Sequence, residues 1–349
     1  MKVFLDDTTG KGNLYPFTVT RSVADIRIGI LTIREKWKKI SGQDIHTLSE
    51  INTEHDKQNN GRVFPAGMVP SKHNVEALLS GTKESSSILL QYPWHIFQYN
   101  DKALREDFEL ICDGRMSQQL SSTNKAISAE NIFIEEGAVV EHSILNAREG
   151  PIYIGKNALI MEACSIRGPF AMCEGSTLKM GTRVYGATTL GPFCTVGGEI
   201  KNSVLFGYSN KAHDGYLGDS VVGEWCNLGA GTSNSNLKNN AGEVSVWADV
   251  IKEYIPVGIK CGVLMGDYSR SAINTSFNTG TVVGLCCNIF ADKFPSKFIP
   301  DFSWGEHSYI LENALRDIDN WKRLKGKQIT TEEIKILTDI YYSQKIKHA

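Results

Sequence analysis

Three side chains in the central part of this chain have types and positions that suit chemistry on a charged substrate. His213 lies within the segment from Lys211 to Asp219, and an imidazole suits general-base catalysis because its ordinary pKa lies near neutrality. Arg183 and Lys201 are 18 residues apart and carry cationic groups of the kind that bind phosphate. Each could also be an exposed side chain without a function, which is the commoner case. The elements that position the three side chains decide between these two possibilities.

Apolar residues recur at every sixth position around these side chains. The unbroken series consists of Ile154, Ile160, Ile166, Met172, Leu178, Val184, Leu190 and Val196. On an α-helix a step of six residues turns by about 600°, so these side chains would point in three directions. On a strand the same step leaves all of them on one side. The spacing therefore predicts a β-solenoid in which three hexads make one triangular coil.

The repeat also predicts how the three side chains lie relative to one another. Because Arg183 and Lys201 are three hexads apart, we expect them to stack on one face in neighbouring coils. The phase slips by two residues between Lys201 and Asn210 and resumes with Tyr216, Val222 and Leu228. His213 follows Lys201 across this slip, so it need not share that face within one subunit. Irregular segments of solenoids often carry function.

The residues on either side of the repeat have different patterns. Residues 1–117 are expected to form a small α/β domain, with strands at Lys2 to Leu5 and Ser87 to Gln91 and helical spacing of Val23, Ile26, Ile30, Ile33 and Trp37. The polar segment 118–128 predicts a linker. We place the solenoid at 129–300 and two C-terminal helices at 301–349, the second of which begins with a capping-box pattern, Thr330 to Glu333.

Composition and charge exclude several classes of protein. The 37 basic and 39 acidic side chains nearly balance, which argues against a nucleic-acid partner. No run approaches the roughly 20 apolar residues that a membrane span needs. Two early carboxylates, Asp6 and Asp7, interrupt any secretory apolar segment, so a cytoplasmic location is expected. The eight cysteines show no metal-ligand spacing, and no metal ligand is assigned.

The segments 211–219 and 227–232, the second reading Asn-Leu-Gly-Ala-Gly-Thr, resemble the acetyltransferase half of a known bacterial family. Its members are bifunctional N-acetylglucosamine-1-phosphate uridyltransferase/glucosamine-1-phosphate acetyltransferase enzymes. The order of elements is most similar to a shortened Bacteroidetes-type variant. The resemblance implies a reduced nucleotidyltransferase-like α/β domain, a left-handed parallel β-helix of hexapeptide repeats and assembly as a homotrimer. It also implies a sugar-1-phosphate, acetyl-CoA and possible UTP as substrates, with Mg²⁺ if the N-terminal site is active.

The resemblance also assigns roles to individual residues. His213 matches the catalytic base, which takes a proton from the amine of the sugar. Two residues, Arg183 and Lys201, match those that hold the sugar phosphate. The other positions that match sugar contacts are Glu199, Tyr216 and Asn227, and those near the acetyl group and coenzyme A are Ala230 and Asn236. Leu237 and Gly242 stand where the family has an aromatic residue and a lysine, so contacts to the donor are expected to differ.

Nucleotide binding by the N-terminal region has weaker support. The segment from Asp7 to Asn13 follows the first predicted strand but lacks the glycine-rich signature of nucleotidyltransferases and its following arginine. Lys11 and Arg21 are the candidate substitutes. Asp6 and Asp7 could bind Mg²⁺ or form a solvated turn.

Three functions therefore stay open. The first is acetyl-CoA-dependent N-acetylation of glucosamine-1-phosphate, with His213 as general base, in UDP-N-acetylglucosamine synthesis. The second is Mg-dependent uridylyl or thymidylyl transfer to a sugar-1-phosphate through the N-terminal domain. The third is a non-catalytic, trimeric scaffold that binds a nucleotide sugar.

Overall fold

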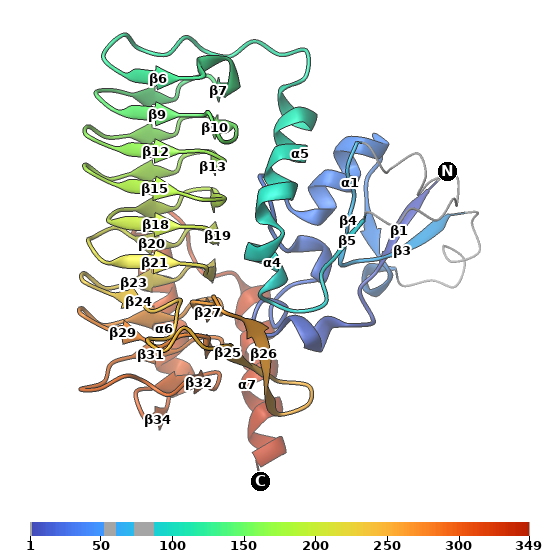
Figure 1. Cartoon of the computed structure of the whole chain (residues 1–349). Helices are drawn as coiled ribbons and strands as arrows, with labels where there is room; N and C mark the ends of the chain where they lie inside the picture. Colours follow the sequence, from blue (N-terminus) through green and yellow to red (C-terminus); the bar gives the residue numbers. More distant parts are fainter. Residues whose placement is uncertain (1, 52–60, 73–86, 349) are drawn as a thin grey trace.

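A β-helix forms the body of the molecule (Figure 1). The computed structural model describes residues 2–51, 61–72 and 87–348. Each coil adds one short strand to each of three parallel sheets. The predicted fold class is confirmed in its three parts: an α/β region comes first, the solenoid follows, and helices end the chain.

Sheet 1 and sheet 2 run the length of the β-helix. Sheet 1 contains β7 (Ile132–Ile134), β10 (Ile152–Ile154), β13 (Phe170–Met172), β16 (Thr188–Leu190), β19 (Val204–Gly207), β22 (Val221–Glu224), β27 (Val263–Met265), β30 (Thr281–Val283) and β32 (Phe298–Ile299). Sheet 2 contains β8 (Val139–Val140), β11 (Leu159–Ile160), β14 (Thr177–Leu178), β17 (Thr195–Val196), β20 (Asn210–Lys211), β23 (Asn227–Leu228), β28 (Arg270–Ser271), β31 (Asn288–Ile289), β33 (Ser303–Trp304) and the antiparallel β34 (His307–Ser308).

Sheet 3 is shorter and lies on the side that carries the candidate residues. Its strands are β6 (Lys125–Ile127), β9 (Ile144–Asn146), β12 (Ser165–Arg167), β15 (Arg183–Tyr185), β18 (Glu199–Lys201) and β21 (Tyr216–Gly218). Beyond β21, the chain forms a parallel pair, β24 (Ser233–Asn234) with β29 (Ser276–Phe277), and an antiparallel hairpin, β25 (Val244–Ala248) with β26 (Glu253–Gly258). The predicted linker therefore already contains the first strand of sheet 3.

The hexad repeat correctly predicts the interior of the prism. All the apolar residues from Ile154 to Val196 in the series belong to one buried cluster, and Val222 and Leu228 continue it. Tyr216 does not: Leu217 occupies the inward position of β21, and Tyr216 lies on the outer face. The interpretation of Tyr216 as a repeat position is therefore wrong by one residue.

The slip in the repeat begins earlier than predicted. Ser165 pairs with Arg183 after 18 residues, but Arg183 pairs with Glu199 after only 16. The corner between β17 and β18 consists of Gly197 and Gly198 alone. Gly198 has a φ of +79°, and a Cβ there would lie 2.7 Å from the oxygen of Gly215, so only glycine fits this corner. Further shortening follows β18, where Val204 pairs with Thr189.

The N-terminal region covers the outer face of sheet 1. It contains a parallel sheet of β1 (Val3–Asp6), β2 (His46–Thr47) and β3 (Arg62–Pro65), with α1 (Ile33–Ser41), the pair β4 (Met68–Val69) and β5 (Ile88–Leu89), α4 (His95–Gln98) and α5 (Asn100–Cys112). Residues of this region share one apolar cluster with Val204, Val221 and Leu264 of sheet 1. The two parts are therefore joined by a common core.

The helix expected from Val23 begins ten residues later. α1 starts at Ile33 after a capping box in which Thr32 accepts a hydrogen bond from the Glu35 amide. The chain before it is held as a loop, since the Asp107 carboxylate accepts hydrogen bonds from the amides of Ile30 and Leu31. Tertiary contacts thus override the helical spacing of the apolar residues.

Both predicted C-terminal helices are present, as α6 (Leu311–Arg323) and α7 (Thr331–His348). The capping box of α7 forms, because Thr330 and Glu333 exchange hydrogen bonds. The helices pack on Trp225, Tyr268 and other residues at the edge between sheets 1 and 2. Sheet 3 is left with an open outer face.

Candidate active site

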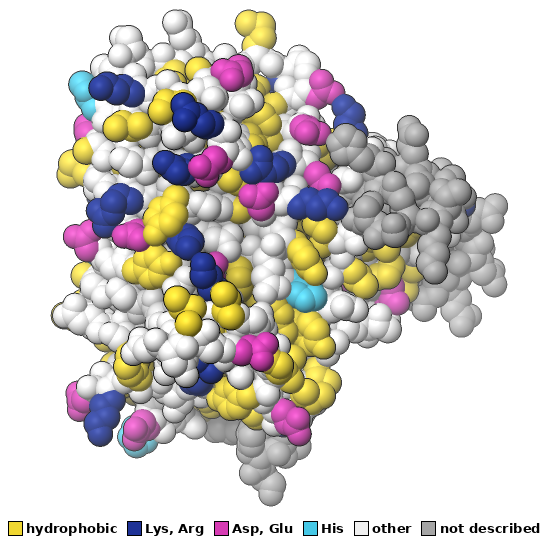
Figure 2. Space-filling view, in the orientation of Figure 1, with side chains coloured by type: hydrophobic (Ala, Val, Ile, Leu, Met, Phe, Trp, Pro, Cys, Tyr) yellow, Lys and Arg dark blue, Asp and Glu magenta, His cyan; other side chains and the backbone are white. Residues whose placement is uncertain are grey.

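The outer face of sheet 3 carries the candidate sugar-binding residues. Its strands alternate exposed and buried side chains, so residues at both ends of β15 and β18 point outward. Basic and acidic side chains gather over these strands (Figure 2). Arg183, Glu199 and Tyr216 begin three successive strands and lie in register. They form one row along the edge of the sheet, which we call the sheet 3 row.

Glu199 connects the sheet 3 row to Tyr185, which lies at the opposite end of β15 from Arg183. Its carboxylate accepts a hydrogen bond of 2.6 Å from the Tyr185 hydroxyl and lies 3.8 Å from Nε of Arg183. This hydrogen bond, together with partial burial, raises the pKa of Tyr185 to about 12. Nζ of Lys201 lies 5.8 Å from the ring centroid of Tyr185. Two cations and a carboxylate thus meet around one tyrosine.

Arg183 and Lys201 share this face but do not stack directly. Arg183 is opposite Glu199, whereas Lys201 is opposite Tyr185. The predicted shared face is therefore correct, but the two side chains are offset along the strands because the Gly197-Gly198 corner removes two residues from the coil. Tyr185 was not predicted, although it follows Arg183 by two residues, and strand alternation places both on one face.

Asn236 joins the same face from the segment after β24. Its side-chain amide donates a hydrogen bond of 3.1 Å to the Tyr216 hydroxyl and another to the Asp219 carboxylate. Asn202 donates to the other oxygen of Asp219 at 2.7 Å. Burial, reinforced by the Asp219 charge, raises the pKa of Tyr216. Tyr216 is therefore a neutral hydroxyl at ordinary pH, held at the end of the sheet 3 row.

His213 lies in the loop between β20 and β21, at the corner from sheet 2 to sheet 3. Its side chain is exposed. The loop borders the sheet 3 row, because the Glu199 amide donates to Gly215 O at 3.1 Å. The structure thus brings the loop of His213 next to Glu199 within one chain, although the two lie on opposite sides of the slip.

Ala230 and Asn227 lie on the other side of this loop. Ala230 is in the next corner, and the neighbouring Gly231 amide donates to Asp214 O at 3.0 Å. Asn227 projects from sheet 2, between Asn210 and Arg270 in the ladder. Within one chain, therefore, Asn227 is on a different sheet from Tyr216, and the residues matched to the sugar do not all share one face.

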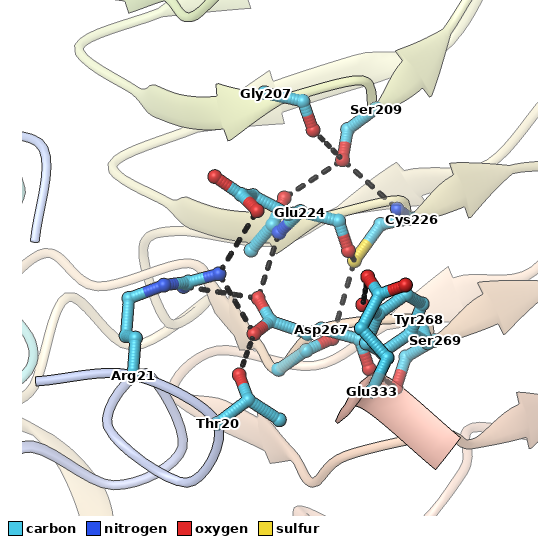
Figure 3. Close-up of polar contacts among 12 residues, drawn as sticks. Thr20, Arg21, Gly207, Ser209, Glu224, Cys226, Asp267, Tyr268, Ser269 and Glu333 are labelled. Atoms are coloured by element: carbon cyan, nitrogen blue, oxygen red, sulfur yellow. Dashed lines mark hydrogen bonds and ion pairs between the residues drawn. The ribbon is translucent and has the colours of Figure 1, made fainter. Parts of the chain in front are cut away.

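The two N-terminal candidates have different surroundings. Lys11 is exposed in the 3-10 turn η1 (Lys11–Leu14), which follows β1. Arg21 instead packs against the outside of the β-helix, where its guanidinium contacts Asp267 at 2.8 Å and Glu224 at 3.3 Å (Figure 3). Burial raises the pKa of Glu224, partly offset by the charge of Arg21. The charge of Arg21 is thus already engaged in joining the two parts of the chain.

Asp6 and Asp7 are engaged in local hydrogen bonds. Asp6 accepts from the Thr8 amide at 2.9 Å, and Asp7 accepts from the Ser49 amide and hydroxyl at 3.1 and 2.6 Å. Among the described residues, no group of three or more histidine, cysteine or acidic side chains is placed to hold a metal ion. The carboxylates of Asp6 and Asp7 are thus both held by hydrogen bonds within the chain. Over the same residues, no helix is both long and apolar enough for a membrane span.

The chain is thus a β-helix of hexapeptide repeats with one open, charged face. An α/β region that contains a parallel sheet precedes the β-helix. Residues 3–80 match a family model described as sugar nucleotidyl transferase. The chain is 31% identical over 199 residues to the bifunctional protein GlmU of Methanocaldococcus jannaschii, covering 57% of this chain and 42% of that protein. It is 34% identical over 109 residues to a bifunctional sugar-1-phosphate nucleotidylyltransferase/acetyltransferase of Sulfurisphaera tokodaii, covering 31% of this chain and 26% of that protein.

These similarities confirm the resemblance predicted from the sequence. A third relative, the bifunctional protein GlmU of Methanococcus maripaludis, is 29% identical over 216 residues and is covered over 46% of its length. The chain thus matches less than half of the length of each of these relatives.

Proposed function

We propose that this protein is a transferase acting on sugar phosphates, and that its central reaction is N-acetylation of glucosamine-1-phosphate with acetyl-CoA. The product would serve UDP-N-acetylglucosamine or related nucleotide-sugar synthesis. One observation carries the proposal: two cations, a carboxylate and a tyrosine lie on the open face of sheet 3, beside the loop of His213. The similarity to the nucleotidylyltransferase/acetyltransferase of Sulfurisphaera tokodaii supports the same class of reaction.

Arg183 and Lys201 would bind the phosphate of the acceptor. Arg183 is available because its ion pair with Glu199 is long, at 3.8 Å, and its side chain is more than half exposed. Such exposed pairs contribute little, so a phosphate can take over the guanidinium, which suits it in charge and shape. Glu199 and Tyr216 would then orient the sugar from the row between them.

His213 would act as the general base. It takes a proton from the acceptor amine as the nitrogen attacks the carbonyl carbon of the thioester. A C–N bond forms, the C–S bond breaks, and the proton passes on to the leaving thiolate of coenzyme A. Ala230 and Asn236 would border the acetyl group. The rigid coils hold the two reactants at a distance from which attack is possible.

A second subunit would complete this site. Asn227 projects from sheet 2 while the sheet 3 row projects from sheet 3, so one chain surrounds the acceptor only in part. We therefore propose a homotrimer in which sheet 2 of one subunit faces sheet 3 of the next. A trimeric mass with acetyl transfer lost on dissociation is the expected result.

Acetyl transfer is tested by free-thiol release from acetyl-CoA with purified protein. Release is expected with glucosamine-1-phosphate, and much less with glucosamine, which lacks the phosphate for Arg183 and Lys201. Equal rates with the two acceptors would contradict the assigned phosphate contacts. No release with any amino-sugar phosphate, alongside binding of a nucleotide sugar by calorimetry, would favour the scaffold function.

A second candidate reaction is nucleotidylyl transfer to a sugar-1-phosphate. The match of residues 3–80 to sugar nucleotidyl transferases favours it. The exposed Lys11 follows the carboxyl end of β1 in a parallel sheet, the end at which open α/β sheets bind ligands. Arg21, with its charge engaged elsewhere, is the weaker of the two candidates.

Pyrophosphate release from UTP or dTTP in the presence of N-acetylglucosamine-1-phosphate tests this candidate. Lys11→Met should abolish the release if Lys11 binds the triphosphate, while thiol release stays unchanged. Pyrophosphate release unaffected by the substitution would remove Lys11 from the site.

A further inference from the structure

A lysine occupies the interior of the prism directly beside the catalytic loop. Lys211 lies at the inward position of β20, in register with Val196 of β17, and is only 1% exposed. The inward residues of the neighbouring strands of sheet 2 are apolar, namely Leu178, Val196 and Leu228. Placing an ammonium there opposes folding unless its hydrogen bonds are satisfied.

The ammonium of Lys211 is satisfied by the backbone of the His213 loop. Its Nζ donates to His213 O at 2.5 Å and to Asp214 O at 3.1 Å. Asp214 O also accepts a hydrogen bond from the Gly231 amide. Among the described residues, the donor to His213 O is Lys211. The lysine therefore holds the carbonyl of the histidine itself from inside the prism.

The loop before β21 has four residues, Ala212 to Gly215, like the corners before β12, β15 and β24, whereas the corner before β18 has two. Its length is therefore ordinary. What distinguishes it is that two of its carbonyls, His213 O and Asp214 O, accept hydrogen bonds from a lysine side chain inside the prism. An ammonium has three donors on a flexible stem, so one lysine can satisfy two consecutive carbonyls.

We propose that Lys211 is a positioning residue that fixes the loop backbone so that His213 points at the acceptor amine. This inference rests on the proposed acetyl transfer. Lys211 itself has no path to the substrate, because its Nζ lies beneath the loop and is spent on the two carbonyls. The Lys211 ammonium is separate from the proposed phosphate-binding residues, since Arg183 and Lys201 lie on strands of sheet 3.

The test measures kcat and KM for acetyl transfer in Lys211→Met, which keeps the length of the side chain and removes its donors. We expect kcat to fall about 100-fold, the effect of a misplacement near 1 Å, with KM for glucosamine-1-phosphate within about twofold of wild type. The melting temperature should stay within a few degrees. Leu228→Met, a volume-conserving change at the next inward position, is the matched control and should leave kcat unchanged.

A double variant separates positioning from general damage. If Lys211 acts only through His213, Lys211→Met should add almost nothing in a His213→Ala background. A full further loss in that background, or unchanged kcat in Lys211→Met alone, would overturn the inference. Wild-type kcat in His213→Ala would instead refute the proposed function, whatever Lys211 does.

A second substitution keeps the proposal testable if Lys211→Met does not fold. Lys211→Gln retains an amide donor without charge, so its kcat should fall, but by a smaller factor than in the methionine variant, with faster hydrogen exchange confined to residues 212–215. Wild-type kcat together with unchanged exchange in Lys211→Gln would contradict the positioning role.

Discussion

At the scale of single residues, the site combines predicted and unpredicted side chains. The candidate roles of His213, Arg183 and Glu199 come from the resemblance to a known family, and the structure places Arg183 and Glu199 in one row beside the His213 loop. Tyr185 and Lys211 were not predicted as residues of the site. An inward lysine looks like a break in the apolar repeat, and only the closed prism reveals that two carbonyls meet it.

Burial of Lys211 predicts a dependence of stability on pH. Desolvation lowers the pKa of its ammonium from 10.5 to about 8. Between those values the unfolded chain binds a proton that the folded chain does not, so the stability contributed by this residue rises with pH in that window. The melting temperature of wild type, relative to Lys211→Met, should increase from pH 7.5 to 9.5. A constant difference over this range would contradict the burial of a charged Lys211.

The phosphate contacts predict a selective effect on acceptor binding. Arg183→Ala removes a guanidinium from the open face, where its ion pair with Glu199 is exposed and contributes little to folding. We expect KM for glucosamine-1-phosphate to rise about tenfold, as loss of one hydrogen bond to a charged group implies, with an unchanged melting temperature. Arg167→Ala, on the neighbouring strand β12, is the matched control. Steady-state kinetics with both variants distinguish a binding residue from a surface charge.

At the scale of elements, the hexad repeat predicts the strands well and the corners poorly. Every residue of the series up to Val196 lies in the core, because the period of the pattern is also the geometric period of the coil. The corner at Gly197-Gly198 changes the register, and no apolar pattern reports the length of a corner. This one element decides that Arg183 lies opposite Glu199 and not Lys201.

Two corner glycines give a matched pair of substitutions. Gly198 and Gly181 both have positive φ, but an added Cβ would lie 2.7 Å from the oxygen of Gly215 at Gly198, and nothing lies within 4 Å at Gly181. Gly181→Ala should cost about 1 kcal/mol, the price of the backbone conformation alone. Gly198→Ala should cost more and should also lower kcat by displacing the His213 loop. Urea unfolding of both variants measures the difference, and equal losses would argue against close packing at Gly198.

At the scale of the whole molecule, the N-terminal region and the β-helix share one apolar cluster. The sequence suggests separate domains because the two parts have different periodicities. The sequence does not reveal that the outer face of sheet 1 carries apolar residues, which pack against the N-terminal region. Arg21 completes this junction through Asp267 and Glu224 (Figure 3).

Breaking this junction should destabilise the entire chain. Arg21→Met leaves Asp267, which is 2% exposed, without its cation, and loss of one partner of a buried pair typically costs about 3 kcal/mol or more. Unfolding should remain a single transition at a lower denaturant concentration. Arg167→Met, which breaks an exposed pair with Glu149, should change stability by less than about 1 kcal/mol. Two separate transitions in the Arg21 variant would show that the parts fold independently.

The role proposed for His213 is that of the base for acetyl transfer on the open face of sheet 3. The most direct measurement compares thiol release by wild type and His213→Ala, with saturating acetyl-CoA and glucosamine-1-phosphate. If His213 is the base, kcat in His213→Ala should fall by about 100-fold or more, within the range that general-base catalysis contributes, with an unchanged melting temperature. Equal rates in the two proteins would contradict this role.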